Sequence, residues 1–388
     1  MGFRLPKLFG ALTPPEQKAS RTGAMFALFS DTRPHWSPEN VTDLAREGYA
    51  KNPVAYRCVR MIAEAVASLP LVLYDGLREL DRHPLLDLIA RPNPHETRAD
   101  LFEAVAGHLL VAGNAYVELV AVAGKPRELY ALRPDRMKVV PGRDGWPEAY
   151  EYSVAGRSVR FDMQEEGALP PILHLKLFHP SDDHYGLSPL QAAHRALDVH
   201  NAASRWNKAL LDNAARPSGA LVYSAAGNLS QDQFERLKSE LELNFQGAAN
   251  AGRPLLLEGG LDWKSLSLSP KDMDFIEAKH AAAREIALAF GVPPMLLGIP
   301  GDNTFSNYAE ANRNFYRSTA LPLANRLLSS LVNWLSPVYG GALRCEPDLD
   351  QVQALSLERD SLWKRVGDAD FLTDEEKRTA VGYGAKPG

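Results

Sequence analysis

Three histidines lie close together near the middle of the chain, at His174, His179 and His184, with Asp182 and Asp183 beside the last of them. Imidazole and carboxylate groups at short spacing can ligate zinc or iron. The spacing here matches none of the recurrent zinc or iron patterns, so we interpret these residues as ordinary strand and loop positions. No metal site is predicted.

A second candidate for chemistry is Ser188, which lies in the sequence Gly-Leu-Ser-Pro. This sequence resembles the first half of the turn that exposes the nucleophilic serine of many hydrolases, but the second glycine of that turn is missing. A serine followed by proline, with Gln191 three residues further on, is typical of a helix N-cap. We therefore assign Ser188 a capping role.

Three carboxylates lie near the start of another predicted helix, at Asp272, Asp274 and Glu277. Negative charges at this end complement the helix dipole, and we prefer this interpretation to a catalytic pair of carboxylates. The sequence has no HExxH, GxGxxG, GxxxxGK[ST] or GxSxG motif. We predict no catalytic residue and no cofactor. A hydrolase with dispersed catalytic residues is the alternative, because such residues need not be neighbours in sequence.

Composition sets further bounds on a chain of 388 residues, of which 45% are hydrophobic and 23% charged, as in ordinary globular domains. The net charge of −5 argues against tight DNA wrapping, which needs many basic groups, but it permits a surface past which DNA slides. Cys58 and Cys345 belong to no CxxC motif and are predicted to be reduced thiols.

No apolar run is long enough to span a membrane, so none is predicted. A membrane-associated scaffold that uses the basic start of the chain is a third alternative. Residues 1–35 are rich in Pro, Ser, Thr and basic residues, and we predict a mobile arm there.

The first half of the chain predicts helices and then many strands. Apolar spacing predicts a helix over Asn52–Leu69, which Pro70 ends, and Thr97 with Asp100 caps another that runs to about Val111. A short helix is expected over 84–90. The expected strands are 71–74, 115–120, 128–132, 137–140, 149–154, 158–161 and 172–178.

The second half predicts long helices around an insert. One helix runs from Ser188 to about Asn213, and a second from Ser269 to Phe290, where Gly291 ends it. Between them the expected elements are strands over 218–224, 254–258 and 263–268 and a helix over 230–246 that a Ser230/Gln233 capping box opens.

After a Gly/Pro/Asn loop, a third helix is expected over 308–335, bent by Pro322 and ended by Pro337. The tail is expected to form helices over 349–366 and 374–381, the second opened by a Thr373/Glu376 capping box. The mixture of these helices with the strands of the first half makes the predicted fold class α+β.

Several short motifs, each weak alone, follow one another in a specific order. They are Asn52–Arg60, Arg91–Pro94, Leu110–Glu118, Leu132–Asp135, Gly186–Leu190, Ala215–Gly219, Asn250–Arg253, Ile286–Pro294 and Leu297–Gly298. Together they resemble the portal proteins of tailed bacteriophages, of the short-chain siphovirus type that also occurs in prophages and gene transfer agents. The resemblance covers about residues 45–335, and neither end of the chain carries a matching motif.

The resemblance implies a portal fold with an α/β wing, two long stem helices, an α/β clip insert, a kinked helix after a tunnel loop and a short helical crown. The implied parts are a mobile arm (1–35), the N-terminal part of the wing (36–186), stem helix 1 (187–213), the clip (214–268), stem helix 2 (269–291), the tunnel-loop region (292–307), a wing or channel helix (308–340) and a short crown or C-terminal tail (341–388).

The implied function is that of a ring of about twelve subunits at one vertex of a capsid, through which double-stranded DNA is packaged and ejected. The implied partners are further copies of the chain, the DNA in transit, the major capsid protein, the large terminase and then the head-tail adaptor. The implied location is the virion or a phage-like particle assembled in the cytoplasm of a bacterial host. A gene transfer agent portal would have the same role.

The resemblance also implies site residues. The tunnel loop would present Asp302, Asn303, Thr304, Phe305, Ser306 and Asn307 to DNA, and the clip would dock the terminase and the adaptor through Phe234, Leu237, Lys238, Glu240 and Glu242. The basic candidates on the stem helices are Arg195, Arg205, Lys208, Lys271, Lys279 and Arg284. These either touch phosphates transiently or form salt bridges between subunits, and the sequence leaves both readings open.

Overall fold

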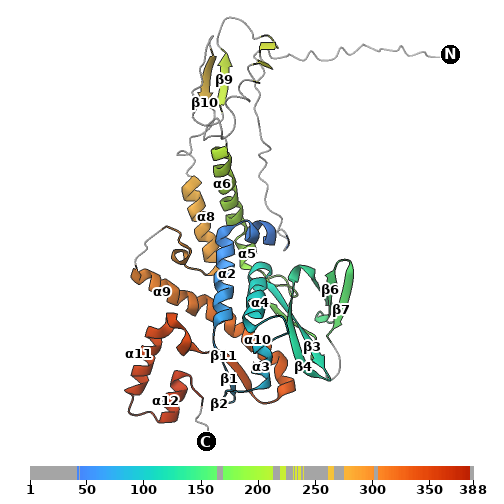
Figure 1. Cartoon of the computed structure of the whole chain (residues 1–388), viewed down its shortest axis with the longest axis vertical. Coiled ribbons are helices and arrows are strands. Elements are labelled where there is room, and N and C mark those ends of the chain that lie inside the picture. Colours follow the sequence, from blue (N-terminus) through green and yellow to red (C-terminus); the bar gives the residue numbers. More distant parts are fainter. Residues whose placement is uncertain are drawn as a thin grey trace, which may run out of the picture. The chain divides into compact units, whose positions relative to one another are not determined.

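The computed structural model describes residues 42, 44–163, 169–212, 219–223, 230, 232–233, 235–236, 239, 261–265, 275–300 and 305–384. The arm expected over 1–35 lies outside them, as do the strand expected over 254–258 and most of the helix expected over 230–246. In the described part, helices and small antiparallel sheets are mixed (Figure 1), which confirms the predicted α+β class.

The first helices form much of the core. They are α2 (Pro53–Ser68), α3 (Pro84–Ala90) and α4 (Arg98–Ala112), preceded by the π-helix η1 (Leu44–Ala50). Helix α2 packs against α4, and its buried side chains lie three and four residues apart, which is the pattern of one helical face. The capping box of Thr97 and Asp100 opens α4 as predicted, and all three helices have the expected positions.

The described residues between 71 and 176 contain eight strands. They are β1 (Leu71–Asp75), β2 (Arg78–Leu80), β3 (Asn114–Val122), β4 (Lys125–Leu132), β5 (Met137–Pro141), β6 (Pro147–Val154), β7 (Arg157–Asp162) and β8 (Ile172–Lys176). Two antiparallel sheets have the orders β4-β3-β8 and β5-β6-β7. Their apolar faces share a small core that includes Tyr116, Val139 and Tyr150.

A third sheet joins distant parts of the chain. Strand β11 (Leu343–Pro347) pairs with β1 in the order β11-β1-β2, and Leu73 lies opposite Cys345. Strand β11 was not predicted, because a five-residue strand after two glycines is too short to show a periodicity of its own. Both cysteines are buried and free, and burial raises the pKa of Cys58 to about 12 and that of Cys345 to about 11.

The central segment contains α5 (Pro189–Ala192), α6 (His194–Asp212), β9 (Gly219–Tyr223), β10 (Leu261–Ser265) and α8 (Phe275–Phe290). Ser188 caps α5 by accepting from the backbone N–H of Gln191, as predicted. The single helix expected from Ser188 is wrong in one respect, because the backbone at Ala193 has a ψ of 0°, which interrupts the regular helix and divides it into α5 and α6. Strands β9 and β10 form an antiparallel pair.

The long helix after the loop also differs from the prediction. It consists of α9 (Phe305–Phe315), a π-helical turn η5 (Tyr316–Ala320) and α10 (Leu321–Tyr339). The irregularity directly precedes Pro322, whose missing N–H removes one ladder bond at the point where η5 continues into α10. The helix does not end at Pro337 but continues to Tyr339, and the Ser336 hydroxyl donates to the Asn333 carbonyl (3.4 Å), which the proline leaves without a backbone donor.

The tail has the two helices α11 (Ser356–Gly367) and α12 (Asp374–Val381). The helix expected from Leu349 begins late, because its first residues form the 3₁₀ turns η6 (Leu349–Gln351) and η7 (Gln353–Leu355) around an extended Val352. Helix α12 has the predicted bounds and the predicted capping box of Thr373 and Glu376.

Candidate functional site

The helix pair α6 and α8 lies at the centre of the candidate site. The two helices pack side by side (Figure 1), and α8 also contacts α2 and α5. Small residues such as Ala203, Ala283 and Ala287 lie on the buried faces, which allows close packing of the backbones. The pair is therefore joined to the helical core at the end where α6 begins and α8 ends.

A buried polar cluster, which we call the Asn52 node, fixes α6 to the start of α2. The Oδ1 of Asn52 caps α2 by accepting from the N–H groups of Val54 (3.0 Å) and Ala55 (3.1 Å). Its Nδ2 lies 3.1 Å from Nδ1 of His200 and donates to Oδ1 of Asn201 (2.9 Å), both on α6. Asn52 and His200 are only 1% and 3% exposed, so the node is a desolvated joint with its bonds satisfied.

Asn201 extends the node by donating through Nδ2 to the Glu47 carbonyl of η1 (3.0 Å). Burial lowers the pKa of His200, and the charge of Lys279 on α8 lowers it further. The ring therefore stays neutral, which suits its acceptance of a hydrogen bond from Asn52. The node thus connects η1, α2 and α6 and sets how α6 is rotated about its own axis.

A close crossing of two glycines positions the segment that leads into α5. A Cβ added to Gly113 would lie 2.6 Å from the carbonyl carbon of Gly186, and a Cβ on Gly186 would lie 2.6 Å from the Leu177 nitrogen. Gly113 also has φ of +72°, at the end of α4. Leu110–Glu118 and Gly186–Leu190, two of the motifs that carry the family resemblance, therefore lie in contact. The contact leaves space for backbone atoms but not for a side chain.

Asn114 and His174 complete this crossing. Asn114 Oδ1 accepts from the Gly186 N–H (2.8 Å) and lies 3.1 Å from His174 Nε2, while the Tyr150 hydroxyl lies 3.3 Å from His174 Nδ1. Tyr116 stacks on the imidazole at 4.3 Å between ring centroids. His174 thus has a structural role, and the described residues contain no cluster of His, Cys, Asp and Glu that could hold a metal ion.

We expect this histidine to make the fold sensitive to acid. Burial lowers the pKa of His174 to about 3, so the folded protein keeps the ring neutral while the unfolded chain protonates it below about pH 6.5. The contribution of His174 to stability should be full above pH 6.5 and should fall toward pH 3 by up to about 1.4 kcal/mol per pH unit. Urea unfolding from pH 7.5 to 4.5 measures this slope, which should be shallower in His174→Gln; an equal slope would contradict the assignment.

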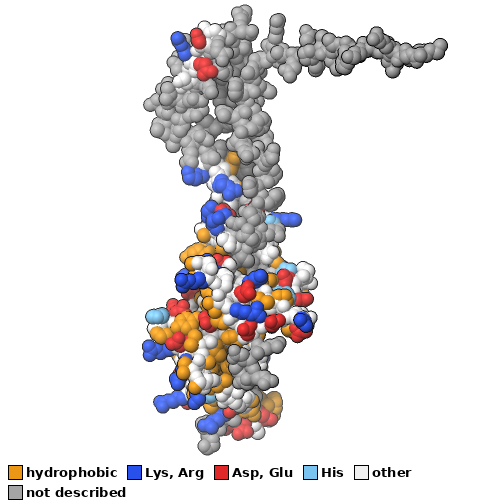
Figure 2. Space-filling model, turned by 90° about the vertical axis from the view of Figure 1, so that its right-hand side faces the viewer, with side chains coloured by type: hydrophobic (Ala, Val, Ile, Leu, Met, Phe, Trp, Pro, Cys, Tyr) orange, Lys and Arg blue, Asp and Glu red, His pale blue; other side chains and the backbone are white. Residues whose placement is uncertain are grey.

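The six basic stem candidates have different surroundings. Arg195, Arg205 and Lys208 are exposed on α6, and Lys271 lies outside the described residues. Lys279 is half-buried and its charge acts on His200, while the exposed Arg284 donates to the Pro300 carbonyl. On the face in Figure 2, basic and acidic side chains are interspersed.

The predicted tunnel loop begins in a well-packed turn. Gly298 has φ of +70°, Ile299 is buried against Ala283 and Ala287, and the 3₁₀ turn η4 (Pro294–Leu297) precedes them. Asp302, Asn303 and Thr304 lie outside the described residues. Phe305, Ser306 and Asn307 belong to the first turn of α9 rather than to a loop, which corrects the expected start of the helix at Tyr308.

The π-turn of the following helix contacts the end of α8. The hydroxyl of Thr319 donates to the Gly291 carbonyl (2.6 Å). A Cβ added to Gly291 would lie 2.8 Å from the Thr319 hydroxyl oxygen. Arg317 pairs with Glu358 of α11 (3.2 Å). The helix that leaves the loop is thus held by α8 on one side and by the tail on another.

The predicted docking residues of the insert, Phe234, Leu237, Lys238, Glu240 and Glu242, lie outside the described residues. Just before them in the chain, Ser230 and Gln233 form the expected capping box. The Ser230 N–H donates to Oε1 of Gln233 (3.0 Å), and the Gln233 N–H donates to Oγ of Ser230 (3.3 Å). Their role as a docking surface stays a prediction.

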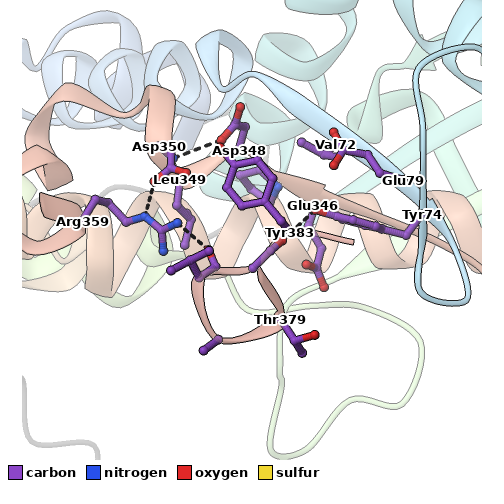
Figure 3. Close-up of a pocket in the computed structure, with 14 residues that line it drawn as sticks. Val72, Tyr74, Glu79, Glu346, Asp348, Leu349, Asp350, Arg359, Thr379 and Tyr383 are labelled. Atoms are coloured by element: carbon purple, nitrogen blue, oxygen red, sulfur yellow. Dashed lines mark hydrogen bonds and ion pairs between the residues drawn. The ribbon is translucent and has the colours of Figure 1, made fainter. Parts of the chain in front are cut away.

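A pocket of about 220 Å³, which no sequence pattern indicates, lies between the sheet β11-β1-β2 and helices α11 and α12 (Figure 3). The Tyr74 hydroxyl donates to the Gly382 carbonyl (2.9 Å), and Arg359 bonds Asp350 and the Val381 carbonyl. Trp363 Nε1 donates to the same Asp350 carboxylate (3.2 Å). These contacts attach the tail to β1, so we interpret the pocket as a structural joint.

The fold and the site together define the class of protein: a helix pair held at one end by a core of helices and small sheets, with an insert between the two helices. The family model "Phage portal protein" matches residues 53–382. The chain therefore belongs to the phage portal protein family and is a portal subunit. This family is structural rather than catalytic, which bears out the prediction of no enzyme.

Relatives and solved structures support the same assignment. The chain is 42% identical to an uncharacterized protein of Rickettsia bellii, over 87% of this chain and 88% of that one, and 26% identical to the portal protein of Enterobacteria phage HK97, over 86% and 79%. It is 58% identical to a chain in the neck of an empty GTA particle computed with C6 symmetry, with a TM-score of 0.72 over 92% and 96%. Within the described residues, no helix is long and apolar enough to cross a membrane.

Proposed function

We propose that copies of this chain form a ring-shaped portal channel at one vertex of a phage-like particle, through which double-stranded DNA enters during packaging and leaves during ejection. The observation that carries the proposal is the 57% identity, over 91% of this chain, to a chain in the neck of a native GTA particle computed with C12 symmetry. Twelve copies and assembly in the cytoplasm of a bacterial host are part of the proposal.

The particle that we favour is a gene transfer agent. The identity to the neck chains of GTA particles is 57–58%, whereas the identity to the HK97 portal protein is 26%. Identity at this level is typical of proteins that share partners as well as a fold. We therefore assign the ring to the neck of such a particle, and a portal of an infectious phage is the second candidate.

The proposed partners follow from the parts of the chain. We assign residues 214–268 to the docking of the large terminase during packaging and of the head-tail adaptor afterwards. The wing would face the major capsid protein, and the segment 302–307 would line the channel. The overall net charge of −5 supports a channel that does not hold DNA, since phosphate attraction would oppose sliding.

Particle size tests the proposal directly. Twelve chains of 42.7 kDa give a ring of about 0.5 MDa, whereas an enzyme of this size is more often a monomer to tetramer. We expect mass photometry of the purified full chain to show such a particle, and negative-stain images to show a central hole. A sample that stays monomeric at every concentration would overturn the proposal.

The tunnel loop makes a second prediction. Deleting all of 298–307 would also remove the buried Ile299 and the first turn of α9, so we replace residues 301–304 alone by a Gly/Ser segment of equal length. Rings should form normally, but particles should hold at least several-fold less DNA, because the side chains of Asp302, Asn303 and Thr304 that would meet the duplex are gone. DNA content per particle, with Lys125→Ser at an exposed position of β4 as control, measures this. Normal DNA content would contradict the tunnel-loop assignment.

A further inference from the structure

The π-turn η5 inserts one extra residue into the helix that runs from α9 to α10. The backbone N–H of Leu321 donates to the carbonyl of Tyr316, five positions back, whereas a regular helix bonds residues four positions apart. Pro322 has no N–H to donate, so the ladder of backbone bonds is weakened at this turn. Single π-turns inside helices are rare and frequently mark functional sites. Contacts outside the helix must therefore help to hold the turn.

The side chains at the turn fit two registers of the helix. If the turn became a regular helix while α10 stayed in place, each residue of α9 would take the place of its predecessor. That change turns α9 by about 100° about its axis and moves it by about 1.5 Å. Tyr316 would then occupy the place of Phe315, which is only 2% exposed. Because both rings have the same size, core packing alone distinguishes the registers weakly.

One carboxylate of the tail holds the turn from outside. Oε1 of Glu358, in the first turn of α11, lies 3.2 Å from Nη1 of Arg317 in the π-turn and 3.9 Å from Nε of Arg313 on α9. Arg313 also pairs with Glu310 (2.7 Å), but its Nε is buried and has no hydrogen-bond partner among the described residues. Glu358 thus supplies negative charge beside a buried cationic group.

The pairs with Glu358 depend on the present register. A rotation of about 100° would carry Arg313 more than a quarter of a turn around the helix, away from this carboxylate. Arg317 lies within the turn that would be rebuilt. On the other side, the Thr319 hydroxyl donates to the Gly291 carbonyl (2.6 Å) and fixes the part of the turn nearest α10. The Glu358 carboxylate therefore stabilises the π-turn relative to a regular helix.

We propose that Glu358 is a positioning residue through which the tail sets the rotation of α9 about its axis. While its carboxylate holds Arg313 and Arg317, the π-turn persists; when the carboxylate is withdrawn, the turn relaxes and α9 rotates. The proposal deepens the proposed function and rests on it for one consequence only. Because α9 begins within the segment 302–307 that would line the channel, a rotated helix presents different residues there.

Spin labels measure this rotation. Labels on Asn314→Cys of α9 and Ser329→Cys of α10, both exposed positions, report one distance in the present register, and the buried Cys58 and Cys345 do not react. Glu358→Gln removes the charge and nearly preserves the size of the side chain. We expect a second distance, in a share of molecules that rises roughly fivefold or more over the unchanged protein.

Arg317→Gln should give the same second distance, because it breaks the pair from the other side. Labelled chains are diluted with unlabelled full-length chains, so that distances within one chain dominate in any assembly. Absence of rings would overturn the proposed function and leave this measurement intact. A single native distance in either Glu358→Gln or Arg317→Gln would overturn the positioning role of Glu358.

Deleting Ser318 separates this role from general destabilisation. Ser318 is exposed, and its deletion removes the extra residue, so a regular helix keeps α9 in its present rotation. Glu358→Gln should then leave only the native distance, and a second distance that persists would contradict the proposal. The matched control is Glu375→Gln, which removes a first-turn carboxylate from α12 and should leave the native distance alone. A second distance in this control would show that any loss of charge from the tail rotates α9.

Discussion

Replacing Gly186 by alanine should abolish the native fold of the segment that leads into α5. The added methyl group would overlap the Gly113 carbonyl oxygen and lie 2.6 Å from the Leu177 nitrogen, and both neighbours are backbone atoms that cannot rotate away. The Asn114 side chain also holds Gly186 through its N–H (2.8 Å), so the segment cannot shift without breaking buried bonds. We expect a loss of at least about 4 kcal/mol, the upper end for single substitutions.

The measurement is the free energy of unfolding in urea, with soluble yield as a second readout. Gly107→Ala is a matched control, because Gly107 lies within α4 and a Cβ there would meet nothing within 4 Å. That change should stabilise the helix by about 0.5–1 kcal/mol. Gly113→Ala should behave like Gly186→Ala, since it adds a clash from the other side. A cost below about 1 kcal/mol for either would show that the two segments are not in contact.

Local signals in the sequence predicted most of the helices and strands. Caps such as Thr97 with Asp100, and stops such as Pro70 and Gly291, act within a few residues of the boundary that they set. The structure differs where the outcome depends on distant atoms. Alanine favours helix, so Ala193 itself predicts no interruption, yet the regular helix is interrupted there.

The candidate site was predictable only in part. The order of motifs pointed to the family and to the helix pair, but the motif containing Asn52 gave no sign that its side chain would bond His200 and Asn201, about 150 positions away. The same holds for Gly113 and Gly186, whose proximity depends on how β3 and β8 pair. Contacts of this kind follow from topology, which a single sequence specifies only through the whole fold.

Asn52→Ala should cost about 2–4 kcal/mol and loosen α6 from the rest of the protein. The substitution removes the N-cap of α2, worth about 1 kcal/mol. It also leaves His200 Nδ1 and Asn201 Oδ1 without their donor in a desolvated place, which costs about 1–3 kcal/mol more. Water cannot replace the lost donor freely, because Asn52 and His200 are almost fully buried.

Thr97→Ala separates the two contributions, because Thr97 caps α4 at an exposed position and bonds nothing on another element. That variant should lose only about 1 kcal/mol, so the difference between the two changes measures the node. Hydrogen exchange shows where the protein is loosened. The backbone amides of α6 near His200 should exchange faster in Asn52→Ala than in the unchanged protein, and at the unchanged rate in Thr97→Ala. Equal costs with equal exchange would show that Asn52 is only a cap. A larger cost confined to Asn52 would mean that α6 keeps its orientation on α2 through this node.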